Sequence, residues 1–166
     1  MISFQRFTTE YNKAEDRLRL CAEIEDGETL SLMLTQRLMM RLLPKLFKWM
    51  EDIDGDDLRA DLMRGFNQRA ARQKQVRRAP IKASEMSEEW LVTNVKMRTR
   101  ASGVKLVFEY DQDRCAALSL PLASARQWLN ILFDNWRLAH WPLDFWPDWV
   151  SESRPKRGKP SARAIH

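Results

Sequence analysis

The sequence predicts an α+β fold in which antiparallel β-hairpins are each followed by an amphipathic helix. Three observations predict this class: apolar and polar residues alternate in pairs of short segments, a turn separates the two members of each pair, and a segment with helical periodicity follows. The scheme occurs twice, over about 1–53 and about 90–139. This repetition indicates an internal pseudo-duplication joined by a central helix, and a chance recurrence of the same elements is the alternative.

Both hairpins are predicted from alternation with a period of two, the pattern of a strand with one buried face. In the first hairpin, Asp26 and Gly27 supply the turn between the alternating segments, and in the second a polar stretch over 111–114 does so. A further strand precedes each hairpin. The predicted strands cover residues 1–8, 18–24, 30–34, 90–100, 104–110 and 118–122.

Each hairpin leads into a predicted helix that buries one face. Thr35 is the expected N-cap of the first helix, and Ser124 with Gln127 forms a capping-box pattern at the start of the second. Pro44 should kink or break the first helix, or start a new one at Lys45. The apolar positions recur at steps of three and four. They are Met39, Leu42, Leu43, Leu46, Phe47 and Met50 in the first helix, and Trp128, Leu129, Leu132, Phe133 and Trp136 in the second.

A central helix is predicted over about 56–75, and Pro80 lies beyond its end. Its apolar positions form a narrow stripe at steps of four, which should pack on one neighbour and leave the rest of the helix in water. The stripe consists of Leu58, Leu62, Phe66 and Ala70, with Met63 beside it.

The pattern predicts a single α+β domain over 1–150. Its two similar halves are 1–53 and 90–150, and a connecting helix followed by a basic linker occupies 54–89. Residues 151–166 contain Pro, Gly and five basic side chains, which is typical of a disordered tail.

The net charge of +5 is unevenly distributed. Residues 69–82 contain six basic residues and no acidic one, and residues 151–166 contain five basic residues against Glu152 alone, so the rest of the chain is mildly acidic. Basic residues also alternate along the predicted strand 90–100. Gathered cations release counterions from a polyanion, so nucleic acid is a candidate partner. The predicted polyanion-binding residues are Arg69, Arg72, Lys74, Arg77, Arg78, Lys82, Lys96, Arg98 and Arg100.

Aromatic residues are concentrated near the end of the second half. The chain has seven tryptophans, and four of them lie between residues 136 and 149. Tryptophan is enriched at the centres of interfaces as well as in cores, so this segment is either a partner surface or a cap on the chain's own core. The predicted partner-binding residues are Trp141, Phe145, Trp146 and Trp149.

Several chemistries lack their motifs. Two histidines and two distant cysteines do not make a zinc site by local spacing, and no GxSxG, Walker-type or GxGxxG sequence is present. The acidic run near Asp52 departs from a calcium loop, because Gly55 is at the fourth position of the loop instead of the sixth and Met63 occupies the twelfth, where a Glu is needed. We therefore expect no metal and no cofactor, and the sequence favours a protein that is not an enzyme. Its many carboxylates leave an enzyme of another type open.

No segment reaches the about 18 consecutive apolar residues of a membrane span, and residues 1–13 lack the pattern of a leader, so we expect a cytoplasmic protein without a membrane partner. The apolar and aromatic surplus predicts a non-enzymatic interaction, scaffold or regulatory module that associates with itself, as a homodimer, or with another protein. The alternative is a nucleic-acid-binding protein that uses the segment 69–82, the Lys96, Arg98 and Arg100 strand face, and the tail.

Overall fold

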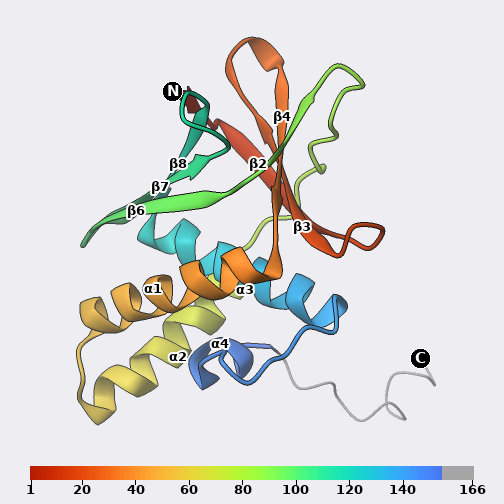
Figure 1. The fold of residues 1–166 in the computed structure, drawn as a ribbon. Coiled ribbons are helices and arrows are strands. Elements are labelled where there is room, and N and C mark those ends of the chain that lie inside the picture. Colours follow the sequence, from red (N-terminus) through yellow and green to blue (C-terminus); the bar gives the residue numbers. More distant parts are fainter. Residues whose placement is uncertain (155–166) are drawn as a thin grey trace, which may run out of the picture.

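The computed structural model describes residues 1–154 and confirms the α+β class (Figure 1). The sheets occupy the upper part of the view and the helices the lower part. The strands are β1 (Ile2–Ser3), β2 (Arg6–Asn12), β3 (Arg17–Glu23), β4 (Thr29–Leu34), β5 (Glu88–Leu91), β6 (Asn94–Arg100), β7 (Gly103–Glu109) and β8 (Cys115–Pro121). The α-helices are α1 (Gln36–Asp54), α2 (Leu58–Gln73), α3 (Leu122–Leu138) and α4 (Asp148–Ser151), and a 3-10 turn spans Glu25–Gly27.

The two halves exchange one strand each. Sheet A has the order β1-β8-β7-β6, and sheet B has the order β2-β3-β4-β5. Each half supplies three antiparallel strands of one sheet, while its first strand pairs in parallel with the other half: β1 with β8, and β5 with β4. Ile2 lies opposite Ala116, Glu88 lies opposite Leu30, and one offset of 86 residues relates the two pairs. The halves are therefore equivalent in topology and in register.

The start of α3 differs from the prediction. The alternating leucines predict a strand over 118–122, but the strand register makes Leu118 the equivalent of Leu32. Leu122 is consequently the first residue of α3 rather than the end of a strand, and Pro121 occupies the N-cap position. Ser124 lies inside the helix, so the predicted capping box is wrong. Proline has no N–H to donate and fits the start of a helix, which explains why the strand ends at Pro121.

The helix α1 runs through Pro44 without a break. Thr35 caps it as predicted, because its hydroxyl accepts a hydrogen bond from the Leu38 N–H at 3.1 Å. Pro44 lies on the exposed side of the helix. Apolar residues that precede it and apolar residues that follow it are buried on the opposite face. Packing of that face stabilises the continuous helix against the hydrogen bond that proline removes.

One hydrophobic core joins both halves. The inner faces of the two sheets contribute leucines such as Leu20 and Leu106, and the helices contribute Leu43 and Leu129. α3 packs against β2 of the first half as well as β7 and β8 of its own, and α1 packs against β6. The helices thus lie across the boundary between the halves, which fixes the two sheets relative to one another.

The central helix α2 is turned the other way from the prediction. Its stripe of Leu58, Leu62 and Phe66 is exposed, and the side that packs on the protein contains Arg64 and Gln68. The prediction failed because apolar periodicity ignores polar partners. Here a buried network satisfies the polar side, and the apolar side is left outward.

This network joins α2 to the ends of α1 and α3. The Arg64 Nε lies 3.4 Å from an Asp54 carboxylate oxygen, and the Arg126 Nη2 donates to the same carboxylate at 3.1 Å. The Gln68 amide donates to the Asn130 side-chain oxygen at 2.8 Å. Removing one partner of a buried pair costs far more than an exposed pair contributes, so the network fixes the rotation of α2.

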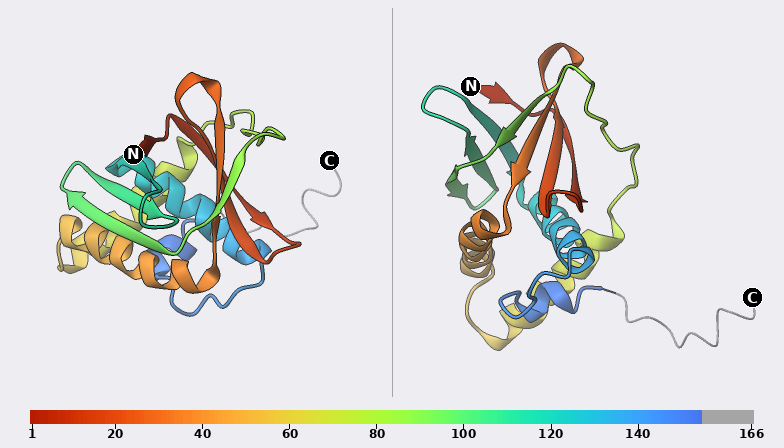
Figure 2. Two further views of the ribbon diagram at one scale, coloured as in Figure 1. Left: turned by 45° about the horizontal axis from the view of Figure 1, so that its top comes forward. Right: turned by 45° about the vertical axis from the view of Figure 1, so that its right-hand side comes forward.

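The segment between α2 and β5 lies against the outer face of sheet B. The Ile81 N–H donates to the Thr8 hydroxyl at 3.0 Å, and the Ser84 N–H donates to the Thr29 hydroxyl at 3.2 Å. Cys21 on this face is only 3% exposed. Figure 2 shows the segment along one side of the molecule and β6, β7 and β8 on the other.

The chain packs on itself as far as Arg154. The Ser153 hydroxyl donates to the Asn130 side-chain oxygen at 3.0 Å, and the Arg154 guanidinium lies 3.4 Å from an Asp134 carboxylate oxygen. Residues 155–166, the remainder of the predicted tail, lie outside the described residues.

Candidate functional site

The outer face of sheet A is basic and open. Lys96, Arg98 and Arg100 alternate along β6, so their side chains project from one face, and Lys105 projects from the same face of β7. All four are exposed. Gly103 stands opposite Arg100, where a Cβ atom would come within 2.6 Å of the Leu120 carbonyl oxygen. Three of the predicted polyanion-binding residues therefore share one surface, and Lys105 joins them.

Two cations on this face stand directly opposite one another. The register pairs Arg98 with Lys105, and neither has an ion-pair partner within residues 1–154. Directly opposed like charges on adjacent strands destabilise a sheet. The pairing therefore costs stability, and nothing in the described part of the fold offsets the cost.

One acid moderates the face. The Glu109 carboxylate lies 2.5 Å from the Lys96 ammonium and accepts a hydrogen bond from the Asn94 amide at 2.7 Å. These two contacts, that of Lys96 first, hold the pKa of Glu109 below its usual value. Glu109 is therefore ionised at neutral pH, and the charge of Lys96 is partly neutralised.

A second group of cations lies on α1, which runs beneath β6 (Figures 1 and 2). The Trp49 indole N–H donates to the Arg100 carbonyl at 3.0 Å and ties the helix to the strand. Four exposed basic residues follow one another at steps of four and three along the helix surface. They are Arg37, Arg41, Lys45 and Lys48.

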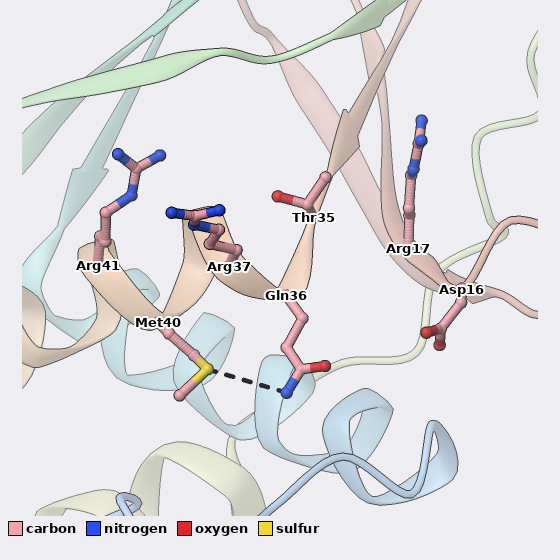
Figure 3. A pocket seen from close by; sticks show the side chains of 7 residues that line it. All are labelled: Asp16, Arg17, Thr35, Gln36, Arg37, Met40 and Arg41. Atoms are coloured by element: carbon pink, nitrogen blue, oxygen red, sulfur yellow. Dashed lines mark hydrogen bonds between the residues drawn. The ribbon is translucent and has the colours of Figure 1, made fainter.

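The start of α1 is hollowed beside these residues. The hollow has a volume of about 620 Å³, and its lining includes Arg17, Arg37 and Arg41. In Figure 3 the Arg17 and Arg41 side chains point upward, and Arg37 is turned toward Arg41. The one acid in the lining of the hollow is Asp16. Hydrogen bonds from the Tyr11 hydroxyl at 2.5 Å and the Trp141 indole at 2.9 Å hold the pKa of Asp16 below its usual value. The first backbone N–H groups of the helix add positive potential at this end.

The other predicted polyanion-binding residues do not join this surface. Arg72 forms a two-pronged ion pair with Asp134 of α3, at 2.8 and 3.1 Å. Arg69 is exposed on α2. The remaining four are exposed on the segment that leads to the opposite side of the molecule (Figure 2). They are Lys74, Arg77, Arg78 and Lys82. The basic segment that follows α2 and the basic face of β6 therefore lie on different sides of the molecule (Figure 2).

The aromatic segment packs on the chain's own core. Trp141 and Trp146 are only 6% and 5% exposed, and Phe145 and Trp149 are partly buried against the same cluster. Trp136 contacts three of these rings, with centroid distances of 4.8 to 5.7 Å. The segment thus occupies the position that the core-capping alternative describes, and its use by a partner stays a prediction.

Sequence reasoning missed the cations of α1 and Lys105. The steps of four and three from Arg37 to Lys48 were visible as a helical stripe, and Lys105 alternates in phase with its strand. Their arrangement beside β6 was not visible, because it depends on how α1 crosses from one half to the other.

The described part of the chain lacks two other kinds of site. Among residues 1–154, no group of three or more His, Cys, Asp or Glu side chains is placed to hold a metal ion. None of the helices in this part of the chain is long and apolar enough to cross a membrane. No protein-family model, curated protein or solved structure matched the chain.

Proposed function

We propose that this protein binds nucleic acid through its phosphates, on the open face of sheet A and the neighbouring stripe of α1. The opposition of Arg98 and Lys105 carries the proposal, because two exposed cations that repel one another become favourable when a polyanion lies across them. An anion bound there would offset the cost that the fold leaves unmet.

The spacing suits an extended chain of charges. Alternate residues of a strand are about 6.7 Å apart, so β6 presents a row of cations at a repeat similar to that of successive phosphates in an extended nucleotide strand. Lys105 widens this row toward β7. Contacts of this kind position a nucleic acid without reading its bases, so we expect binding with little sequence preference.

The composition of the face disfavours a membrane surface. Proteins that lie on membranes insert large apolar or aromatic side chains among the lipids beside their cations. The outer face of β7 and β8 instead carries Val107, Ala117 and Ser119, and none of the most exposed large apolar residues of the described chain lies on these strands. Nucleic acid is therefore the better match.

The test is the salt dependence of binding to a fluorescently labelled oligonucleotide, measured by anisotropy. Five phosphate contacts predict that the logarithm of the association constant falls with the logarithm of salt concentration with a slope of about −4.5 for duplex DNA. The five residues are Arg98, Arg100, Lys105, Arg37 and Arg41. Arg6→Ala, on the outer face of sheet B, should leave the affinity unchanged. Absent or salt-insensitive binding would overturn the proposal, as would tighter binding to anionic lipid vesicles than to the oligonucleotide.

A second candidate function is association between protein chains. The observation that favours it is the exposed apolar stripe of α2, whose four large side chains meet no other part of the described structure closely enough to be buried.

A further inference from the structure

The helix α2 exposes four large apolar side chains on neighbouring positions of its surface. Leu58, Leu62, Phe66 and Met63 are 79%, 70%, 57% and 45% exposed. Single exposed apolar residues are ordinary, but residues three and four apart on a helix adjoin one another and form one face. Large contiguous apolar patches on soluble proteins are typical of interaction sites.

The fold keeps this face outward. Rotating α2 to bury its leucines would move Arg64 away from Asp54, and Gln68 away from Asn130. Unpairing a buried charge is strongly destabilising, so the rotation is not a cheap alternative. Only another molecule, or the part of the chain after residue 154, can therefore bury this apolar face of α2.

The charges of α2 indicate what covers it. Asp56 precedes the helix and Arg69 lies near its end, and both are exposed and without an ion pair in residues 1–154. A helix with one acidic and one basic end complements itself when two copies lie antiparallel. Parallel copies would bring like charges together.

We infer that α2 pairs with α2 of a second copy of this chain, antiparallel about a two-fold axis near Leu62. Leu58 then faces Phe66 of the second copy, and Asp56 lies near Arg69 of the second copy. Each contact occurs twice, as two-fold symmetry requires. Gly65 lies beside this axis and leaves room for the second copy. A Cβ atom at Gly65 would contact only the end of the Arg69 side chain, at 3.9 Å.

A hollow beside α2 strengthens the complementarity. It has a volume of about 570 Å³ and lies between α2 and α4. Its lining includes the acids Asp56, Asp61, Asp148 and Glu152, together with Arg64 and Arg69 of the same chain. Acids outnumber cations in this lining, so Arg69 of the second copy would be attracted to it. The acidic half of the interface is therefore broader than one side chain.

The dimer should be weak. One helix from each copy buries less than the about 800 Å² per partner of a typical stable complex. We expect a dissociation constant on the order of 10 µM, so the monomer and dimer exchange over ordinary laboratory concentrations.

The first experiment is sedimentation velocity over a concentration series. Leu62→Asp should weaken association at least about tenfold, since it buries a charge at the axis. Leu138→Asp is the matched control, because Leu138 is 66% exposed on α3, and it should dimerise like the wild type. Circular dichroism verifies that both variants fold. A wild type that stays monomeric at millimolar concentration overturns the inference, and so does a dimer that Leu62→Asp leaves intact.

The second experiment identifies the occupant. Asp56→Arg and Arg69→Asp should each weaken self-association, whereas a mixture of the two variants should form a heterodimer, because both contacts between them join opposite charges. A mixture no tighter than either variant alone overturns the antiparallel pairing. Deleting residues 155–166 should leave the dimer unchanged; a dimer that forms only after the deletion would mean that the chain's own end covers α2, and would also overturn the inference.

Discussion

The outer faces of the two sheets share one register and carry opposite chemistry. In sheet B, Glu10 stands opposite Arg19, with 4.0 Å between their charged atoms, and Arg19 also lies 3.8 Å from Glu89. At the equivalent positions of sheet A, Arg98 stands opposite Lys105. One scaffold thus accepts an attractive and a repulsive pair at the same place. This difference shows that the fold does not require a basic face on sheet A. The cations of this face can therefore serve binding.

The faces also differ in what covers them. The segment between α2 and β5 lies on sheet B and hydrogen-bonds to Thr8 and Thr29, whereas no described segment bonds in this way to the outer face of β6 and β7. The sequence between the halves is thus used as a cover for one sheet only. Of the two sheet faces, only the outer face of sheet A is expected to bind nucleic acid.

The largest effect should come from removing the cations of the open face together. Arg98→Ala, Arg100→Ala and Lys105→Ala in one variant should lower the affinity for an oligonucleotide about 100-fold at low salt and reduce the salt slope by about 3. Fluorescence anisotropy measures both. The same number of alanines at Arg6, Arg19 and Lys82, on the side of sheet B, is the control, and an equal loss in the two variants would erase the distinction between the faces.

Uncovering sheet B should be the next largest effect. Ile81→Asp places a charge against the face and should lower the free energy of unfolding by about 1–2 kcal/mol. Cys21, which is buried beneath, should then react faster with a thiol reagent. Labelling rates in a Cys115→Ser background report on Cys21 alone. Unchanged labelling would mean that the segment does not protect this face.

The α1 stripe should contribute less than the sheet. Arg37→Ala with Arg41→Ala should weaken oligonucleotide binding about tenfold, because two phosphate contacts are lost. Lys74→Ala with Arg78→Ala, on the other side of the molecule, is the matched control. If the control pair had the larger effect, the binding surface would lie along the segment 74–87 instead.

The smallest expected effect is an increase in the affinity for the oligonucleotide. Glu109→Gln removes the one acid that pairs with Lys96, so affinity should rise about threefold and the salt slope should steepen by about 1. In the wild type, the affinity for the oligonucleotide should rise as the pH falls through the lowered pKa of Glu109, because protonation of Glu109 releases Lys96. The same protonation should lower the free energy of unfolding, because the ionised carboxylate stabilises the folded state. The variant should lack this pH dependence. Identical pH profiles would show that Glu109 does not modulate the face.

Local pattern predicted the hairpin strands and the helices, but it gave one strand over 1–8 and one over 90–100 where the structure has β1 and β2, and β5 and β6, in different sheets. The alternation over 18–24 and 30–34 predicts β3 and β4, because one face of each strand is buried. The strands β1 and β5 pair in parallel with strands of the other half. The two partners of the β1 pairing are more than 110 residues apart in sequence, and such a pairing leaves no local pattern. The side of α2 that packs was likewise set by Arg64 and Asp54, partners that hydrophobic periodicity does not register.

The candidate surface was predicted only in part, because local alternation places residues on one strand face but does not show which strands and segments lie beside it. Alternation of Lys96, Arg98 and Arg100 within one strand sufficed to place them on one face. The addition of Lys105 and the separation from Arg77 and Arg78 depend on the sheet register and on the course of the linker, which only the three-dimensional arrangement provides.

The most direct measurement gives sheet A the charge pair of sheet B. Arg98→Glu places an acid opposite Lys105, as Glu10 stands opposite Arg19. If the open face exists to hold phosphates, the variant should unfold with a free energy higher by about 0.2–1 kcal/mol and bind the oligonucleotide at least about tenfold more weakly. If the cations serve only to keep this edge strand from pairing with other chains, glutamate would serve equally, and oligonucleotide affinity unchanged from the wild type would contradict the proposed function.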